Sequence, residues 1–152
     1  MPKKLLLICS SGGHLLQLHS LLGPLWSDYD RSWVSFDKSD TRSLLKEEKV
    51  HWGFFPTNRN LRNLWRNWRM ARKVIREEQP DVVISTGAGV AVPYLIQARR
   101  QGIRTIYIES YARRDNLSLS GKLVYRFVDH FLVQSPGLAE QYAKARYYGT
   151  IY

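Results

Sequence analysis

Short apolar segments alternate with longer amphipathic segments along the whole chain. The first of them, residues 5–9, is uninterrupted, as in a strand that is buried on both faces of a sheet. The apolar segments predict strands at residues 5–9, 31–36, 50–55, 82–85, 105–109, 131–134 and 146–148. Between them, apolar residues recur at helical spacing, as Leu15, Leu18, Leu22 and Leu25 do, and predict helices at residues 15–26, 39–48, 61–78, 90–100, 118–127 and 137–144.

This alternation of strands and helices predicts an α/β fold. A parallel sheet with helices on both faces, Rossmann-like, is the arrangement that such spacing favours. The length of 152 residues fits one domain, residues 1–152. Because ligands of such sheets lie beyond the carboxyl ends of the strands, the informative loops are Ser10–His14, Thr57–Asn60, Thr86–Gly89 and Glu109–Arg114.

The net charge of the chain limits the kinds of partner that it can bind. Lysine and arginine number 23 against 13 acidic residues, a net charge of +10, which favours a nucleic acid, an acidic membrane surface or a phosphorylated substrate. Cys9 is the only cysteine, so an internal disulfide is excluded and a reducing cytoplasm fits. No apolar run is long enough to cross a bilayer.

Two glycine-containing loops follow predicted strands and precede predicted helices. Glycine lets the backbone approach a ligand closely, and a helix N-terminus presents free N–H groups to an anion. These loops predict phosphate or sugar contacts from Ser11, Gly12, Gly13, Thr86, Gly87 and Gly89. The third glycine of the dinucleotide fingerprint is missing, which disfavours NAD, and a plain tight turn stays open as the alternative for Ser10–His14.

Titratable residues gather at the same predicted edge. His14 is a candidate general base because its pKa lies near working pH, although a capping role is equally open. Glu109 is a second candidate, with an ion pair to Arg113 or Arg114 as its alternative. Arg113, Arg114 and Lys122 are candidates for holding a diphosphate.

The loop Asn58, Arg59 and Asn60 follows the third predicted strand and belongs to the same predicted site. The histidines are scattered without metal-ligand spacing, so we expect no metal and no cofactor.

The predicted helix at residues 61–78 is basic and amphipathic. One helical stripe holds Leu61, Leu64, Trp65, Trp68, Arg72 and Ile75, and another holds Arg62, Arg66, Arg69, Lys73 and Arg76. Such a helix suits the surface of an anionic membrane, with Trp65, Trp68, Arg62, Arg66 and Arg69 as contacts. The alternative is an ordinary crossover helix whose tryptophans pack on the sheet. No nucleic-acid-binding motif accompanies the charge, so nucleic acid is disfavoured.

Six segments in order carry a resemblance to a known family. They are Ser10–His14, Phe55–Asn60, Ser85–Pro93, Ile106–Ser110, Leu119–Tyr125 and Phe131–Gln134. Together they resemble the membrane-anchoring, acceptor-side subunit of the two-subunit N-acetylglucosaminyltransferase that builds dolichol-linked chitobiose. The chain looks closer to the bacterial branch, the PssD type of capsule and exopolysaccharide glycosyltransferase subunit.

This resemblance implies the N-terminal, acceptor-side half of a GT-B glycosyltransferase, with a separate donor-binding subunit as partner. It implies transfer from a UDP-sugar to a polyprenyl-diphosphate-linked acceptor, by a subunit that is inactive alone. By resemblance, Gly12, Gly13 and His14 face the acceptor, His14 is the preferred base and Glu109 is the second.

The alternative function is a non-catalytic scaffold that recruits and activates the catalytic subunit. The eukaryotic members have an N-terminal transmembrane helix that is not seen in this sequence, so we expect peripheral attachment to the inner face of the plasma membrane.

Overall fold

A single parallel sheet organises the molecule. The computed structural model describes residues 3–23 and 28–149. Within these residues the sheet has seven strands in the order β3-β2-β1-β4-β5-β6-β7. The strands are β1 (Lys4–Cys9), β2 (Asp30–Phe36), β3 (Val50–Gly53), β4 (Val82–Gly87), β5 (Arg104–Ile108), β6 (His130–Leu132) and β7 (Ala145–Arg146). Every neighbouring pair is parallel, which confirms the predicted fold class.

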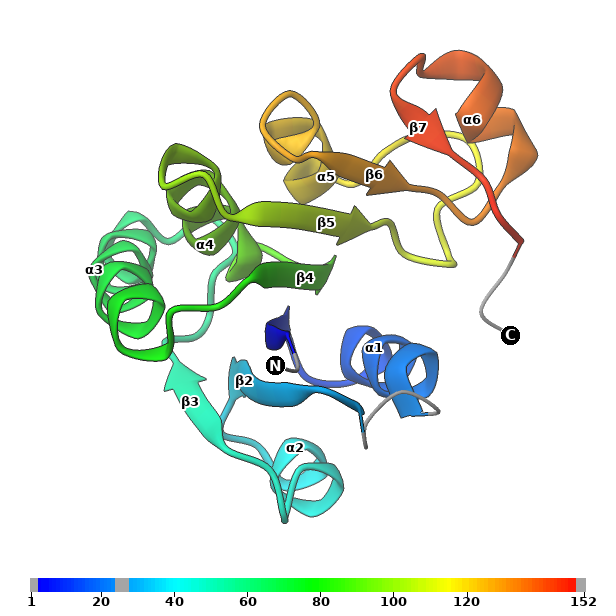
Figure 1. The fold of residues 1–152 in the computed structure, drawn as a ribbon. Helices are drawn as coiled ribbons and strands as arrows, with labels where there is room; N and C mark the ends of the chain where they lie inside the picture. Colours follow the sequence, from blue (N-terminus) through cyan, green and yellow to red (C-terminus); the bar gives the residue numbers. More distant parts are fainter. Residues whose placement is uncertain (1–2, 24–27, 150–152) are drawn as a thin grey trace.

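Helices cover both faces of this sheet (Figure 1). They are α1 (Gly13–Leu22), α2 (Ser39–Leu44), α3 (Leu61–Glu78), α4 (Ala91–Arg100), α5 (Leu119–Val124) and α6 (Pro136–Gln141). One core cluster joins the sheet to α3, α4 and α5, and a second joins it to α1 and the end of α2. Leu15 and Leu18 are buried as predicted, whereas Leu25 and Trp26 lie outside the described residues.

All the predicted elements in the described residues are present, but several end earlier than predicted. The third strand was expected to reach residue 55 and ends at Gly53. The side-chain amide of Asn67 replaces the next ladder bonds, since its Oδ1 accepts from Phe54 N at 2.9 Å and its Nδ2 donates to Phe54 O at 2.9 Å. The helix expected at residues 39–48 ends at Leu44, and Glu48 instead accepts from Arg31 Nε at 2.6 Å.

The apolar stripe of α3 is not the side that faces the sheet. Its sheet-facing side holds Asn63, Asn67, Ala71, Val74, Ile75 and Glu78, so of the predicted apolar stripe only Ile75 is buried. Asn63 and Asn67 can lie inside because their side chains bond main-chain groups of the loop after β3; Asn63 Nδ2, for example, donates to Pro56 O at 2.8 Å. The alternative in which both tryptophans pack on the sheet is wrong for Trp65, which is 61% exposed.

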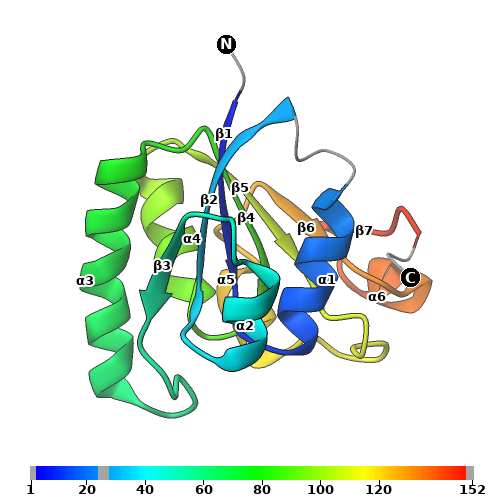
Figure 2. The same ribbon diagram turned by 90° about the horizontal axis from the view of Figure 1, so that it is seen from below.

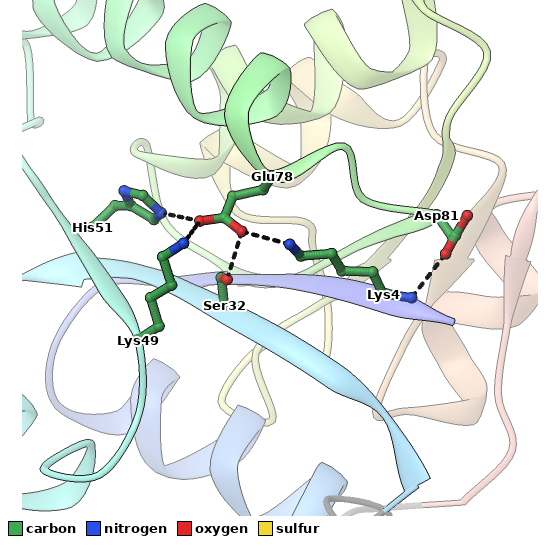
Figure 3. Close-up of polar contacts among 6 residues, drawn as sticks. All are labelled: Lys4, Ser32, Lys49, His51, Glu78 and Asp81. Carbon is green, nitrogen blue, oxygen red and sulfur yellow. Dashed lines mark hydrogen bonds and ion pairs between the residues drawn. The ribbon is translucent and has the colours of Figure 1, made fainter. Parts of the chain in front are cut away.

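A buried carboxylate joins α3 to the amino ends of three strands (Figure 3). Glu78 accepts from Lys4 Nζ at 2.9 Å, Lys49 Nζ at 2.7 Å, His51 Nε2 at 2.7 Å and Ser32 Oγ at 3.0 Å. This network lies at the end of the sheet opposite the carboxyl ends of the strands. It therefore anchors the long helix without occupying the edge where ligands of such folds bind.

Candidate functional site

The carboxyl ends of the strands bring four loops to one end of the molecule (Figure 2). These loops follow β1, β3, β4 and β5 and precede α1, α3, α4 and α5. They enclose a cavity of about 610 Å³. The polar residues that line it include His14, Asn58, Arg59, Asn60, Arg113 and Ser118.

His14 lies in the first turn of α1 and is held by the loop after β4. Its Nδ1 is 2.8 Å from the carbonyl oxygen of Thr86, and Thr86 Oγ1 donates to the His14 carbonyl at 2.7 Å. A carbonyl oxygen can only accept, so Nδ1 carries the hydrogen. In the neutral imidazole Nε2 is then the acceptor, which is the state that a general base needs.

Gly87 makes room for that imidazole. A Cβ added at Gly87 would lie 3.1 Å from His14 Cε1 and 3.3 Å from the Tyr107 hydroxyl, and its φ of +110° is one that L side chains rarely adopt. Gly87 and the fully buried Thr86 therefore hold His14, and neither lines the cavity.

The loop after β3 contributes most of the polar wall. Arg59, an exposed cavity-lining residue, has a φ of +50°, which is uncommon for a residue with a side chain. Asn60 caps α3, since its Oδ1 accepts from Asn63 N at 2.9 Å. Backbone strain of this kind concentrates at ligand-binding sites. Gly89 faces this loop, and a Cβ there would lie 3.2 Å from Thr57.

The first glycine loop is placed differently from the expectation. Ser11, Gly12 and Gly13 do not line the cavity, although His14 beside them does. Gly12 N donates to Asp40 Oδ2 at 2.8 Å. The Gly12 N–H, which the sequence analysis assigned to a phosphate, thus already donates to a carboxylate. The cations of the site come instead from Arg59 and Arg113.

Glu109 is buried behind the cavity wall rather than within the cavity. Its carboxylate accepts from Ser110 N at 2.9 Å, from Ser118 N at 3.0 Å and from Ser118 Oγ at 2.9 Å. Ser110 and Ser118, and not Arg113 or Arg114, therefore bond this carboxylate. Gly121 permits the arrangement, since a Cβ there would overlap Glu109 Oε2. Lys122 is exposed on α5 and does not line the cavity.

Tyr107 and Ser118 are among the cavity residues that the sequence reasoning missed. The Tyr107 hydroxyl lies 3.2 Å from Ser118 Oγ, and both residues line the cavity. Burial, assisted by the charge of Glu109, raises the pKa of Tyr107 above its usual value, so the phenol stays protonated. Ser118 could have been found from its N-cap position before a helical segment, whereas Tyr107 carried no signal within its apolar strand.

The residues expected at a membrane differ in exposure. Trp65, Arg62, Arg66 and Arg69 are exposed, whereas Trp68 is half-buried and lines the cavity. A basic groove of about 640 Å³ runs along the flank of α3 that borders β3, where His51 and Phe54 line it together with Trp65, Arg66, Arg69, Arg72, Lys73 and Arg76. Residues 3–23 and 28–149 contain no helix that is both long and apolar enough to cross a bilayer. In the same residues no three His, Cys, Asp or Glu side chains gather as a metal site would require.

Solved structures of other proteins share this fold. The chain superposes on MurG of Acinetobacter baumannii with a TM-score of 0.82 and 16% identity, covering 99% of this chain and 46% of MurG. It superposes on the lipopolysaccharide outer core galactosyltransferase WaaB with a TM-score of 0.65 and 17% identity, covering 91% and 41%. The chain thus spans about half the length of these structures, and its fold is that of the N-terminal half of a GT-B glycosyltransferase.

Sequence relatives identify the family. Residues 61–151 match the family model described as "Oligosaccharide biosynthesis protein Alg14 like". The mouse protein named UDP-N-acetylglucosamine transferase subunit ALG14 is 32% identical over 97% of this chain and 82% of its own length. This chain therefore belongs to the Alg14-like family, which confirms the family resemblance at this level.

Proposed function

We propose that this protein is the acceptor-binding, membrane-associating subunit of a two-subunit UDP-sugar glycosyltransferase. Its relatives are named as transferase subunits, and its fold corresponds to half of a GT-B enzyme. Residues 1–152 act as one acceptor-side domain, and a donor-binding subunit supplies the other half. The acceptor is a polyprenyl-diphosphate-linked sugar. The six sequence segments favour the PssD type, in capsule and exopolysaccharide synthesis at the inner face of the plasma membrane.

One observation carries this proposal: His14 lines the cavity, and its Nδ1–H donates to the carbonyl oxygen of Thr86 at 2.8 Å. In the reaction, His14 Nε2 takes the proton of the acceptor hydroxyl. The acceptor oxygen attacks the anomeric carbon of the UDP-sugar held by the partner. The bond from that carbon to UDP breaks, UDP leaves with the electron pair, and the configuration is inverted. We expect residues 1–152 alone to have no transferase activity, because they form only one half of the GT-B fold.

The remaining candidate residues fall into three groups. Arg59 and Arg113 hold the diphosphate by charge-assisted hydrogen bonds, with Asn58 and Asn60 beside them. Ser11, Gly12 and Gly13 border the site next to His14, with Lys122 on its outer side. Glu109 acts as a positioning residue, because its carboxylate ties the β5 end to the start of α5.

Membrane attachment is peripheral in this proposal. Trp65 enters the interface while Arg62, Arg66 and Arg69 meet anionic headgroups. The basic groove beside Trp65 supports this assignment, because its cations line the same exposed side of α3. Trp68 is half-buried in the cavity wall, so Trp65 is the tryptophan that this proposal places at the membrane surface.

The complex reconstituted with its donor-binding subunit tests the role of His14. Replacing His14 with Ala should lower kcat by a factor on the order of 10²–10⁴, the usual contribution of a general base, while the complex stays assembled on size-exclusion chromatography. His130→Ala is the matched control, since His130 is exposed at the start of β6 and lies outside the cavity lining. Unchanged turnover by the assembled His14→Ala complex would favour the non-catalytic scaffold instead.

A further inference from the structure

The cavity that holds His14 has two chemically different halves. The polar half is formed by the loops at the strand ends, with Arg59 and Arg113. The other half is formed by three helices: Leu64 and Trp68 of α3, Ile96 of α4 and Leu123 of α5 line it. A ligand that fills both halves must carry an anion next to a hydrocarbon chain.

The mouth of the apolar half is lined by leucines in contact with water. Leu61 is 81% exposed at the start of α3, and Leu119 is 69% exposed at the start of α5. Both line the cavity, Leu61 from α3 and Leu119 from α5. Large exposed apolar groups gathered at one opening mark a binding surface rather than ordinary surface composition.

We propose that this apolar half binds the first isoprene units of the polyprenyl chain of the acceptor. The inference rests on the proposed function and assigns the lipid part of its substrate. The diphosphate faces Arg59 and Arg113, the acceptor sugar faces His14, and the chain runs between α3, α4 and α5. Leu64, Ile96 and Leu123 offer no hydrogen bonds to the hydroxyls of a sugar ring, which favours a hydrocarbon chain beside them.

The exit of the chain coincides with the proposed membrane contact. Leu61 lies at the cavity mouth, and the exposed Trp65 follows one helical turn later. A chain leaving past Leu61 thus enters the bilayer next to the tryptophan. This continuity favours a lipid-linked acceptor over a soluble amphiphile.

Binding of soluble probes in the absence of membranes tests the subsite. The probes are farnesyl diphosphate below its micelle-forming concentration, inorganic diphosphate and farnesol, measured by calorimetry with the intact chain. We expect the wild type to bind farnesyl diphosphate at least tenfold more tightly than inorganic diphosphate or farnesol, because both halves are then filled. Equal affinities for the two diphosphates, or no binding of either, would overturn the proposal.

A double substitution isolates the apolar half. Leu64→Ser with Leu123→Ser should remove the gain from the farnesyl chain and leave the affinity for inorganic diphosphate unchanged. These side chains are 42% and 52% exposed, so their loss costs little folding stability. Leu16→Ser with Leu44→Ser is the matched control, since those leucines are 52% and 37% exposed on α1 and α2, away from the cavity. If the Leu64→Ser, Leu123→Ser variant still binds farnesyl diphosphate more tightly than inorganic diphosphate by the same factor, the proposed lipid subsite is wrong.

The result is separable from the test of the proposed function. If His14 substitutions leave turnover unchanged while the farnesyl chain still improves binding, the lipid subsite stands without the catalytic role. If the farnesyl chain does not improve binding over inorganic diphosphate while His14 remains essential for turnover, the subsite fails and the catalytic role stands.

Discussion

At the scale of single residues, Glu78 shows how one buried charge is made stable. Its side chain is 1% exposed, and burial alone would raise its pKa. The hydrogen bonds from Lys49, Lys4, His51 and Ser32 outweigh this effect and hold the pKa of Glu78 well below its ordinary value. The carboxylate therefore stays charged in the folded state, and its bonds connect the amino ends of β1, β2 and β3 to the end of α3.

Replacing Glu78 with Gln should lower the free energy of unfolding by about 3 kcal/mol at pH 7, because it removes charge-assisted bonds from a buried site. The pKa of Glu78 is lower in the folded state, so its contribution is complete above the unfolded value and is lost as pH falls. Urea unfolding should thus show the difference between wild type and variant shrinking below about pH 4.5, the unperturbed value.

Glu77→Gln is the control for this comparison. Glu77 is 49% exposed and its carboxylate lies 3.9 Å from Lys73 Nζ, so the change should stay within about 0.5 kcal/mol. A Glu78→Gln variant as stable as the Glu77→Gln variant at pH 7 would show that the network contributes no net stability.

At the scale of elements, the short helix α5 depends on residues outside it. Its N-cap Ser118 accepts from Gly121 N at 3.0 Å and donates to Glu109, which belongs to the loop after β5. With six residues, α5 is too short to be stable by itself. The cap and the Glu109 carboxylate therefore fix the helix that carries Leu119 and Leu123 to the cavity.

Gly121→Ala should destabilise the protein by about 1–3 kcal/mol, because the added methyl group overlaps the Glu109 carboxylate. It should also weaken farnesyl diphosphate binding, since α5 lines the cavity. Chemical denaturation and calorimetry give the two readings. Gly137→Ala on α6 is the control, because its Cβ would meet Ser135 Oγ at an ordinary 3.5 Å. Equal stability of both alanine variants would contradict the packing argument.

At the scale of the whole molecule, the net charge of +10 is partly concentrated on one helix. The basic groove follows the flank of α3 that borders β3, with Glu77 as an acid within its lining. The exposed Leu61 and Leu64 of the same helix line the cavity, together with Leu119 of α5. Exposed basic and apolar groups on one helix suit the headgroup and hydrocarbon layers of an anionic membrane.

Changing Arg62, Arg66 and Arg69 together to Gln should reduce binding to anionic vesicles by about a hundredfold, since each basic residue near such a surface contributes about 1 kcal/mol. Flotation with vesicles of phosphatidylglycerol and phosphatidylcholine measures the effect. The triple change of Lys3, Lys46 and Arg104 to Gln removes the same charge from exposed positions outside α3 and should leave binding nearly unchanged. Equal losses in both variants, or binding insensitive to salt, would refute attachment through α3.

The sequence predicted the α/β class and the existence of each described element, since strand and helix periods depend on local pattern. It also predicted that His14 and the Asn58–Asn60 loop lie at the same edge, because parallel strands end together. It did not identify the inner face of α3. Asn63 and Asn67 are polar, and only their bonds to a distant loop make burial possible.

By itself, the sequence determined the order of strands and helices, the excess of positive charge and the family motifs, because these are carried by neighbouring residues. Only the tertiary structure decided that Asp40 binds the Gly12 amide, that Glu109 lies behind the cavity wall and that three helices line its apolar half. Such contacts join residues far apart in the chain, and their geometry depends on how the loops and helices pack around the sheet.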